Sequence, residues 1–302
     1  MKPLGRLLRL SLAPTAAADV AAGTVAGAGA WPGGMEPWLL VLGSLCVYHG
    51  GMVLNDWADR GEDARTRPDR PIPSGAVPVR AALLLGLALL VAGPLVALLA
   101  APRCASLLAA VAVAALVYDL GPRGPLTGPL LLGGCRAGNL AAGLLLGSGG
   151  LAGGLALLPA LLYGGYVFCV SRVARLEDAP AGDGPTGSAR SSPALHLTIA
   201  TVFLAAAPSS ALLHPMEARL RMWAALVLAA AGGAGLVEAA LRTPGWTPQT
   251  LTRVTGLALR RLLVFTAAVA LSAGGTDGWL VAGAILAGYP VSFFLRGVFP
   301  PS

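Results

Sequence analysis

One polar stretch, residues 55–75, lies between two long apolar runs and carries the side chains best suited to chemistry. It reads NDWADRGEDARTRPDRPIPSG and contains five of the fourteen acidic residues of the chain. We expect the preceding apolar run to be a helix that continues into this stretch and ends before Pro68, because proline cannot continue a helix. Side chains three and four positions apart then share one face. That face holds one amide and four carboxylates, from Asn55, Asp56, Asp59, Glu62 and Asp63.

Carboxylates gathered this closely require a positive partner. Like charges four positions apart on a helix repel each other, and the repulsion grows where water is scarce. Oxygen ligands without His or Cys suit Mg²⁺, which usually completes its coordination with substrate phosphates. Arg67 and Arg70 follow directly, and a guanidinium group matches phosphate oxygens well. The stretch therefore predicts a site for a diphosphate held through Mg²⁺.

The order of these residues resembles the first signature motif of the UbiA family of intramembrane prenyltransferases. The resemblance covers the pattern NDxxDxxxD, which starts at Asn55, and RPDRPIPSG, which starts at Arg67. It implies Mg²⁺-dependent transfer of a prenyl group from an isoprenoid diphosphate to an acceptor, either an aromatic ring or a hydroxyl compound, within the membrane. The structural alternative is a mixed-charge loop that caps a membrane helix, but such a loop does not require this order of residues.

The composition predicts a membrane protein. Of 302 residues, 56% are hydrophobic and 12% charged, and the mean hydropathy is +0.73. This is too little polar surface to cover a soluble globule. The net charge of +7 does not indicate nucleic acid binding, since aromatic residues make up 6% and the basic residues are scattered among short loops. We expect a multi-pass protein of the cell (plasma or inner) membrane with a cytoplasmic N-terminus.

Ten apolar runs are long enough to cross about 30 Å of hydrocarbon. The family resemblance implies nine, so we expect one all-α domain over residues 1–302, with nine or possibly ten transmembrane helices around a central cavity open to the cytoplasmic side. The first run follows Lys2, Arg6 and Arg9, and we interpret it as an uncleaved membrane helix because more spans follow. The runs cover residues 11–30, 37–56, 79–101, 103–119, 126–147, 151–172, 194–213, 219–241, 253–273 and 277–296.

Polar residues inside the apolar runs are further candidates for the site. Arg136 and Asn139 are three positions apart and share a helix face. Asp19 is a candidate partner for them, since an ionisable group at that depth is costly and suggests a function. Tyr48 lies on the same helix face as Asn55 and would line a cavity below the metal site. For each of these residues, structural packing is the alternative to substrate binding.

The chain departs from the family at the second aspartate motif, D-x-x-x-D, which follows the sixth helix and holds another Mg²⁺. No two acidic residues in the corresponding run, residues 171–183, are four positions apart. We expect Glu177 and Asp178 to align with the end of the motif, while Arg172 and Arg175 replace its beginning and contact the diphosphate directly. A lost second motif also fits a non-catalytic isoprenoid-diphosphate binder, which is the alternative function.

The resemblance implies a role for each candidate. Metal and arginines would neutralise the departing diphosphate, and a water-free apolar cavity would shelter the allylic cation until the acceptor captures it. Asp178 or Asp19 would take the acceptor's proton, and membrane lipids would surround the protein. A transporter would also bury charges, but it would not need the signature motif. The expected metal ligands are Asn55, Asp56, Asp59, Asp63, Glu177 and Asp178. The expected substrate contacts are Tyr48, Arg67, Arg70, Arg123, Arg136, Asn139, Arg172, Arg175 and Asp19.

Overall fold

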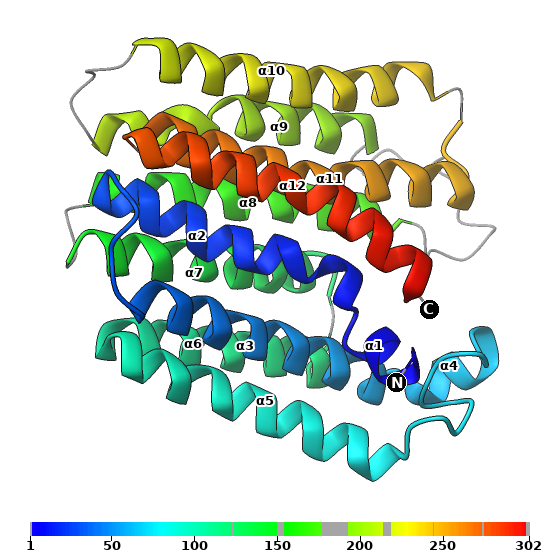
Figure 1. Cartoon of the computed structure of the whole chain (residues 1–302). Coiled ribbons are helices and arrows are strands. Elements are labelled where there is room, and N and C mark those ends of the chain that lie inside the picture. The colour runs from blue at the N-terminus through cyan, green and yellow to red at the C-terminus, as the bar shows by residue number, and fades with distance from the viewer. Residues whose placement is uncertain are drawn as a thin grey trace.

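Long apolar helices run back and forth along one direction and build the protein (Figure 1). The computed structural model describes residues 2–122, 124–149, 154–176, 193–213, 219–243, 245–273 and 275–299. Within these residues, each of the ten predicted apolar runs coincides with helical structure. The helices are α1 (Lys2–Leu7), α2 (Ala13–Ala28), α3 (Glu36–Ala58), α4 (Arg60–Thr66), α5 (Val79–Ala100), α6 (Pro102–Leu120), α7 (Thr127–Gly147), α8 (Leu158–Ala174), α9 (Pro193–Ala205), α10 (Arg219–Arg242), α11 (Pro248–Ala273) and α12 (Thr276–Val298), with 3₁₀ turns η1 (Leu10–Leu12), η2 (Gly154–Leu157) and η3 (Ala207–Leu213).

Within the described residues, seven helices are long and apolar enough to cross a membrane: α3, α5, α6, α7, α10, α11 and α12. Helices α8 and α9 are also apolar but shorter. Helix α2 has 16 residues, which corresponds to about 24 Å. The chain is therefore an all-helical, multi-pass membrane protein. The number of nine or ten spans, and the side to which a cavity opens, stay predictions.

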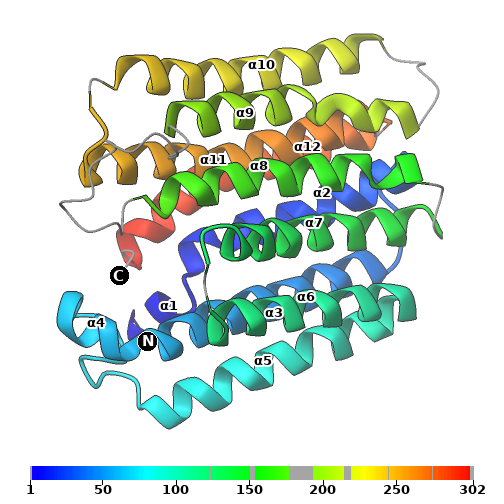
Figure 2. The ribbon, with the colours of Figure 1, turned by 180° about the vertical axis from the view of Figure 1, so that it is seen from behind.

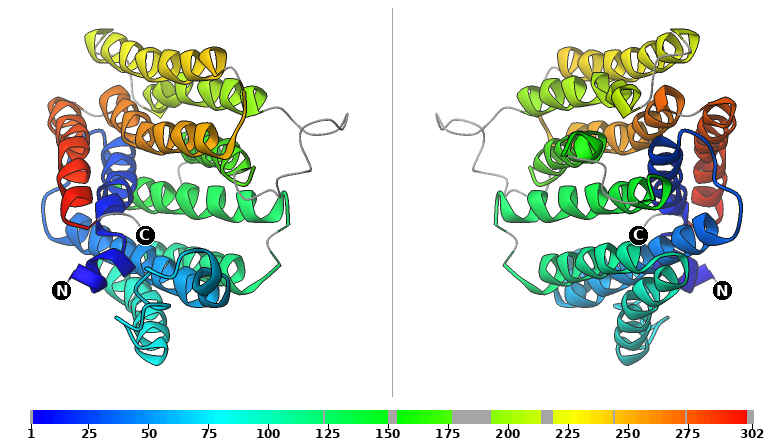
Figure 3. Two further views of the ribbon diagram at one scale, coloured as in Figure 1. Left: turned by 90° about the vertical axis from the view of Figure 1, so that its right-hand side faces the viewer. Right: turned by 90° about the vertical axis from the view of Figure 1, so that its left-hand side faces the viewer.

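The helices stack in layers, with α11 and α12 between α8 and α9, as Figure 1 and the reverse view in Figure 2 show. Helices α3, α5 and α6 form one side, α2, α7 and α8 the middle, and α9 and α10 the other side. Helices α1 and α4 and the last turn of α12 lie at one end of the bundle. Figure 3 looks at this end and at the opposite one. The end that carries α1 and α4 is called the α4 end below.

Glycines let neighbouring helices approach closely, as is common in membranes. A Cβ atom on Gly43 of α3 would lie 2.7 Å from the carbonyl oxygen of Gly93 in α5. Between α2 and α7, a Cβ atom on Gly23 or Gly143 would collide with the backbone of the opposite helix. The close contact of α2 with α7 places the polar residues of these two helices side by side inside the bundle.

The acidic stretch forms two helices and not the single one that we expected. Helix α3 ends at Ala58, Asp59 adopts φ −82° and ψ 0°, and α4 begins at Arg60. The four-residue spacing survives the break, since the amides of Asp59 and Asp63 donate to the carbonyls of Asn55 and Asp59 over 2.9 Å each. Gly61 and the repulsion between neighbouring carboxylates both weaken a continuous helix here. The predicted end before Pro68 is confirmed, because α4 stops at Thr66.

Candidate active site

Two aspartates of the motif share one arginine at the α4 end. Nη1 of Arg70 lies 2.6 Å from Oδ2 of Asp63 and 3.5 Å from Oδ1 of Asp56. All three side chains are buried. The turn after α4 makes this possible, because it folds residues 67–75 back against the end of α3. Arg70 therefore supplies the positive partner that the carboxylates require.

Arg9, which was not among the predicted site residues, is a second partner of the motif. Its Nη2 lies 2.8 Å from Oδ1 of Asp56. Burial opposes the charge, but the Asp56 carboxylate outweighs it, and the pKa of Arg9 is raised above its ordinary value. Arg9 is also the one described non-glycine residue with positive φ, at 49°. Nδ1 of His49 lies 2.7 Å from the carbonyl oxygen of Leu8, so two contacts hold this segment on α3.

Asn55 contacts a carboxylate that sequence reasoning missed. Its Nδ2 donates to Oδ1 of Asp119 over 3.2 Å, and Asp119 is buried at the end of α6. An acidic residue at the end of an apolar run, next to Tyr118, was the available signal. This signal points to the site only because α6 ends beside α3, and the sequence does not reveal that the two helix ends meet. Asp119 joins the candidate set for metal or diphosphate chemistry.

The remaining members of the stretch differ in exposure. Asp59 is half-buried at the break between α3 and α4, whereas Arg67 and Glu62 are exposed. The guanidinium of Arg60 lies over the ring of Trp57, with Cζ 4.4 Å from the ring centroid. Arg67 therefore lies nearer to water than Arg70 does, and Asp59 is intermediate between them.

The two arginines at the end of α8 lie beside the start of α7. Arg172 donates from Nη1 to the carbonyl oxygen of Pro125. A Cβ atom on Gly128 would lie 2.9 Å from Nη1 of Arg175 and 3.5 Å from the ring of Tyr118. The structure thus brings Arg175 next to the residue that precedes Asp119. Three other predicted site residues lie outside the described ranges: Arg123, Glu177 and Asp178.

The predicted partnership of Asp19 with Arg136 is confirmed as a contact. Oδ2 of Asp19, in α2, lies 2.7 Å from Nη1 of Arg136, in α7. Tyr163 donates to Oδ1 of Asp19 over 2.6 Å, and Nη2 of Arg136 donates to Oγ1 of Thr15 over 2.6 Å. Asp19 is fully buried. A buried charge of this kind is tolerable because it is paired and hydrogen-bonded on both oxygens.

Two polar atoms beside this network have hydrogen-bonding capacity to spare. The ring centroid of Tyr48 lies 5.8 Å from Cζ of Arg136, and Asn139 neighbours Asp19. The hydroxyl of Tyr48 and Oδ1 of Asn139 are both buried and have no partner within the described part of the chain. Such atoms are rare in folded proteins, so Tyr48 and Asn139 stay candidates for the site.

The donor set at the α4 end fits Mg²⁺ in its chemistry. It consists of carboxylate and amide oxygens, and Oδ2 of Asp56 is buried without a partner. In this structure the carboxylates of the donor set form ion pairs with Arg70 and Arg9 instead. Accordingly, no three acidic, His or Cys side chains of the described residues gather as a metal-binding group. A cation would bind here in competition with the arginines.

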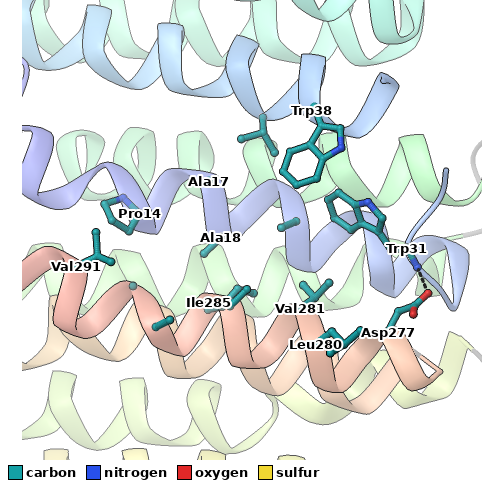
Figure 4. A pocket seen from close by; sticks show the side chains of 15 residues that line it. Pro14, Ala17, Ala18, Trp31, Trp38, Asp277, Leu280, Val281, Ile285 and Val291 are labelled. Atoms are coloured by element: carbon teal, nitrogen blue, oxygen red, sulfur yellow. Dashed lines mark hydrogen bonds between the residues drawn. The ribbon is translucent and has the colours of Figure 1, made fainter. Parts of the chain in front are cut away.

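A cavity of about 750 Å³ lies elsewhere, between α2, α3 and α12 (Figure 4). Its walls are mostly apolar, from Pro14 and Val291 at one end to Trp31 and Trp38 at the other. The backbone amide of Trp31 donates to Oδ2 of Asp277 over 2.9 Å. None of the predicted site residues lines this cavity, so it is separate from the polar site.

Comparison with known proteins identifies relatives over most of the chain. A sequence model of the UbiA prenyltransferase family matches residues 16–255. A Methanoregula boonei protein named digeranylgeranylglyceryl phosphate synthase is 30% identical over 72% of this chain and 78% of its own length. A protein of the same name from Methanothrix thermoacetophila is 39% identical over 41% of this chain, and the chain spans 43% of that relative. A solved UbiA homolog from Archaeoglobus fulgidus, bound to GPP and Mg²⁺, has the same fold, with a TM-score of 0.64 at 17% identity over 93% of this chain and 99% of its own.

Proposed function

The chain belongs to the UbiA prenyltransferase family, and from this premise we propose that it transfers a prenyl group from an isoprenoid diphosphate to an acceptor within the membrane. One observation carries the proposal: Asp56 and Asp63 lie with Arg9 and Arg70 at the end of an apolar helical bundle. A prenyl diphosphate has the matching chemistry, since its head is anionic and its chain is apolar.

The transfer depends on Mg²⁺ in this proposal. The solved relative that binds GPP and Mg²⁺ supports it, as does the oxygen-only donor set with its unpartnered Asp56 oxygen. When bound, the ion supplies positive charge that stabilises the departing diphosphate. The residues that would hold it are Asn55, Asp56, Asp59 and Asp63, together with Glu177 and Asp178.

The reaction breaks the bond between the allylic carbon and the diphosphate oxygen, and the electron pair leaves with the diphosphate. Arg70, Arg67 and Arg123 hold the departing oxygens, with Arg172 and Arg175 acting from the end of α8. Guanidinium groups suit this role because they donate in pairs to phosphate oxygens. The allylic cation forms in the apolar interior, where water does not compete for it.

The acceptor is bound deeper in the bundle, beside Asp19 and Arg136. The unpartnered hydroxyl of Tyr48 and the amide oxygen of Asn139 support this, because a polar group of the acceptor would complete their hydrogen bonds. Two relatives named digeranylgeranylglyceryl phosphate synthase favour a hydroxyl-bearing glyceryl phosphate lipid over an aromatic ring. The acceptor oxygen bonds to the allylic carbon, and its proton passes to Asp178 or Asp19.

The site is proposed to face the cytoplasm, where Mg²⁺ and soluble diphosphate are available. This places the N-terminal segment, α4 and the start of α11 on the inner side of the plasma or inner membrane. The concentration of arginines at the α4 end supports the orientation.

The test uses the purified protein in liposomes with geranylgeranyl diphosphate, Mg²⁺ and one candidate acceptor at a time. Mass spectrometry of the extracted lipids should detect an ether formed with a hydroxyl-bearing glyceryl phosphate lipid, and no product with an aromatic acid. Detection of an aromatic product would show that the acceptor is an aromatic compound and that the proposed acceptor class is wrong. Tight donor binding without any product or diphosphate release would instead favour a non-catalytic binder, consistent with the altered second motif.

A further inference from the structure

Helices α11 and α12 carry three arginines that the proposed reaction does not use. Arg260 and Arg261 lie in the middle of α11, and Arg296 lies in the last turn of α12. None forms an ion pair with an acidic side chain within the described ranges, and Arg296 is near enough to Arg260 for the charges to repel. All three lie beyond residue 255, where the match to the family ends. They are called the α11–α12 arginine cluster.

Both α11 and α12 are long and apolar enough to cross a membrane, and the last turn of α12, which carries Arg296, lies at the α4 end (Figure 1). A Cβ atom on Gly256 would lie 3.9 Å from Nη1 of Arg260, so the Arg260 side chain reaches back one turn toward that end of α11. Long basic side chains near a membrane surface extend in this way to bring their charge to the headgroups. Arg261 points differently, since a Cβ atom on Gly235 of α10 would lie 2.8 Å from its Nη2.

Unused hydrogen-bonding atoms surround the cluster. Nε of Arg261 and Oγ of Ser292 are buried without a partner in the described part of the chain, whereas the hydroxyl of Tyr289 lies beside Arg261. Tyr289, Ser292 and Arg296 are spaced three and four apart, and so they share one face of α12. The Ser292 hydroxyl and the guanidiniums of Arg260 and Arg296 are typical of a phosphate site, because each can donate to a phosphate oxygen.

The neighbouring surface is apolar and exposed. Phe293 and Phe294 of α12 are 82% and 69% exposed. In a membrane-spanning bundle such side chains face lipid chains. A ligand with a phosphate at the arginines and hydrocarbon along these side chains satisfies both parts of the surface.

We propose that the α11–α12 arginine cluster binds the phosphate of an anionic phospholipid from the leaflet at the α4 end. The lipid phosphate relieves the repulsion between Arg260 and Arg296 and joins the middle of α11 to the last turn of α12. Basic pockets between membrane helices bind lipid headgroups by the same electrostatics. A free phosphate offers the same oxygens but nothing for the exposed phenylalanines. The site does not depend on the proposed reaction, and its loss leaves the Asp56–Arg70 site intact.

The test is a lipid titration of the detergent-purified full chain, followed by native mass spectrometry and thermal unfolding. Phosphatidylglycerol should bind and raise the unfolding temperature, whereas phosphatidylcholine and inorganic phosphate should not. Arg260→Gln and Arg296→Gln should each weaken phosphatidylglycerol binding about fivefold, which corresponds to about 1 kcal/mol per basic residue. Arg80→Gln, an exposed arginine at the start of α5, removes the same charge and should have no effect.

Three results would overturn the proposal. They are equal binding of phosphatidylcholine, an equal response to inorganic phosphate, and unchanged phosphatidylglycerol binding in both variants. Should either variant fail to fold, the wild-type comparison of the three ligands still decides. Arg296→Lys is a further control. It keeps the positive charge and should retain most of the phosphatidylglycerol binding.

Discussion

Nη2 of Arg9 lies 2.8 Å from Oδ1 of Asp56, so the segment before the first long helix is tied to the acidic motif 47 positions later. The contact holds although Arg9 has φ 49° and ψ 47°, a conformation that is about 1–2 kcal/mol unfavourable for a residue with a Cβ atom. The geometry of the acidic site therefore includes the N-terminal segment.

Two substitutions of Arg9 distinguish the contribution of its charge to stability from that of its backbone conformation. Arg9→Ala should lower the free energy of unfolding by about 1–3 kcal/mol, because it removes a charge-assisted hydrogen bond to a buried carboxylate. Arg9→Gly should be more stable than Arg9→Ala by about 1 kcal/mol, since glycine adopts positive φ without strain. Denaturant unfolding followed by tryptophan fluorescence measures both. A glycine variant less stable than the alanine variant would contradict the assigned backbone.

Tyr48→Phe tests whether the polar atoms beside Arg136 serve a ligand or the fold. The Tyr48 hydroxyl has no partner in the described structure, so its removal should leave thermal stability unchanged. The KM for the acceptor should rise about 2- to 12-fold, the value of one hydrogen bond of about 0.5–1.5 kcal/mol. Tyr163→Phe is the matched control, because that hydroxyl donates to Asp19 and its loss should destabilise the protein. An unchanged KM in Tyr48→Phe would remove Tyr48 from the acceptor site.

Mutation of Arg175 tests whether arginine takes the place of the second acidic motif. Arg175→Ala should weaken binding of a non-hydrolysable prenyl diphosphate about 10- to 150-fold, the value of one charge-assisted contact of about 1.5–3 kcal/mol. Arg80→Ala should leave the affinity unchanged. Calorimetry measures both, and the Mg²⁺ dependence should fit one ion. If Arg175→Asp instead raises turnover and makes the metal dependence second order, the loop is a decayed form of the ordinary motif.

The orientation is tested with single cysteines in a background that lacks the four native ones, Cys46, Cys104, Cys135 and Cys169. Met35, at the start of α3, and Thr66, at the end of α4, are both exposed and lie at opposite ends of a membrane-spanning helix. An impermeant maleimide should label Met35→Cys in intact cells, and Thr66→Cys after permeabilisation alone. The reverse pattern would place the site outside. Labelling of both from one side would show that α3 does not span the membrane.

The sequence predicts helices well here because apolar runs and prolines are local signals. The run over residues 37–56 became α3, and Pro68 marked the end of α4 as expected. The break at Asp59 was missed because the helical projection assumed one continuous axis. The run over residues 194–213 divides into α9 and the 3₁₀ turn η3, where Pro208 disfavours a regular helix.

Contacts between helices were harder to predict. Asp19 could be paired with Arg136 because charges at similar depth in a membrane need partners. The contacts of Asn55 with Asp119 and of Asp56 with Arg9 span 64 and 47 positions, and no periodicity indicates which helix ends meet. The ion pairs of Arg70 were also missed, because its place in the turn suggested contact with phosphate.

The most direct test of the account compares diphosphate release by Asp63→Asn and Glu62→Gln. Both substitutions remove one carboxylate from α4, but Asp63 is buried against Arg70 and Glu62 is exposed. Protein in liposomes with geranylgeranyl diphosphate and a hydroxyl-bearing glyceryl phosphate lipid should release diphosphate with Mg²⁺ and stop on addition of EDTA. We predict that Asp63→Asn lowers the rate at least about tenfold, the loss of one charged contact, while Glu62→Gln keeps the wild-type rate. Equal rates in the two variants, or release that persists in EDTA, would contradict the proposed site.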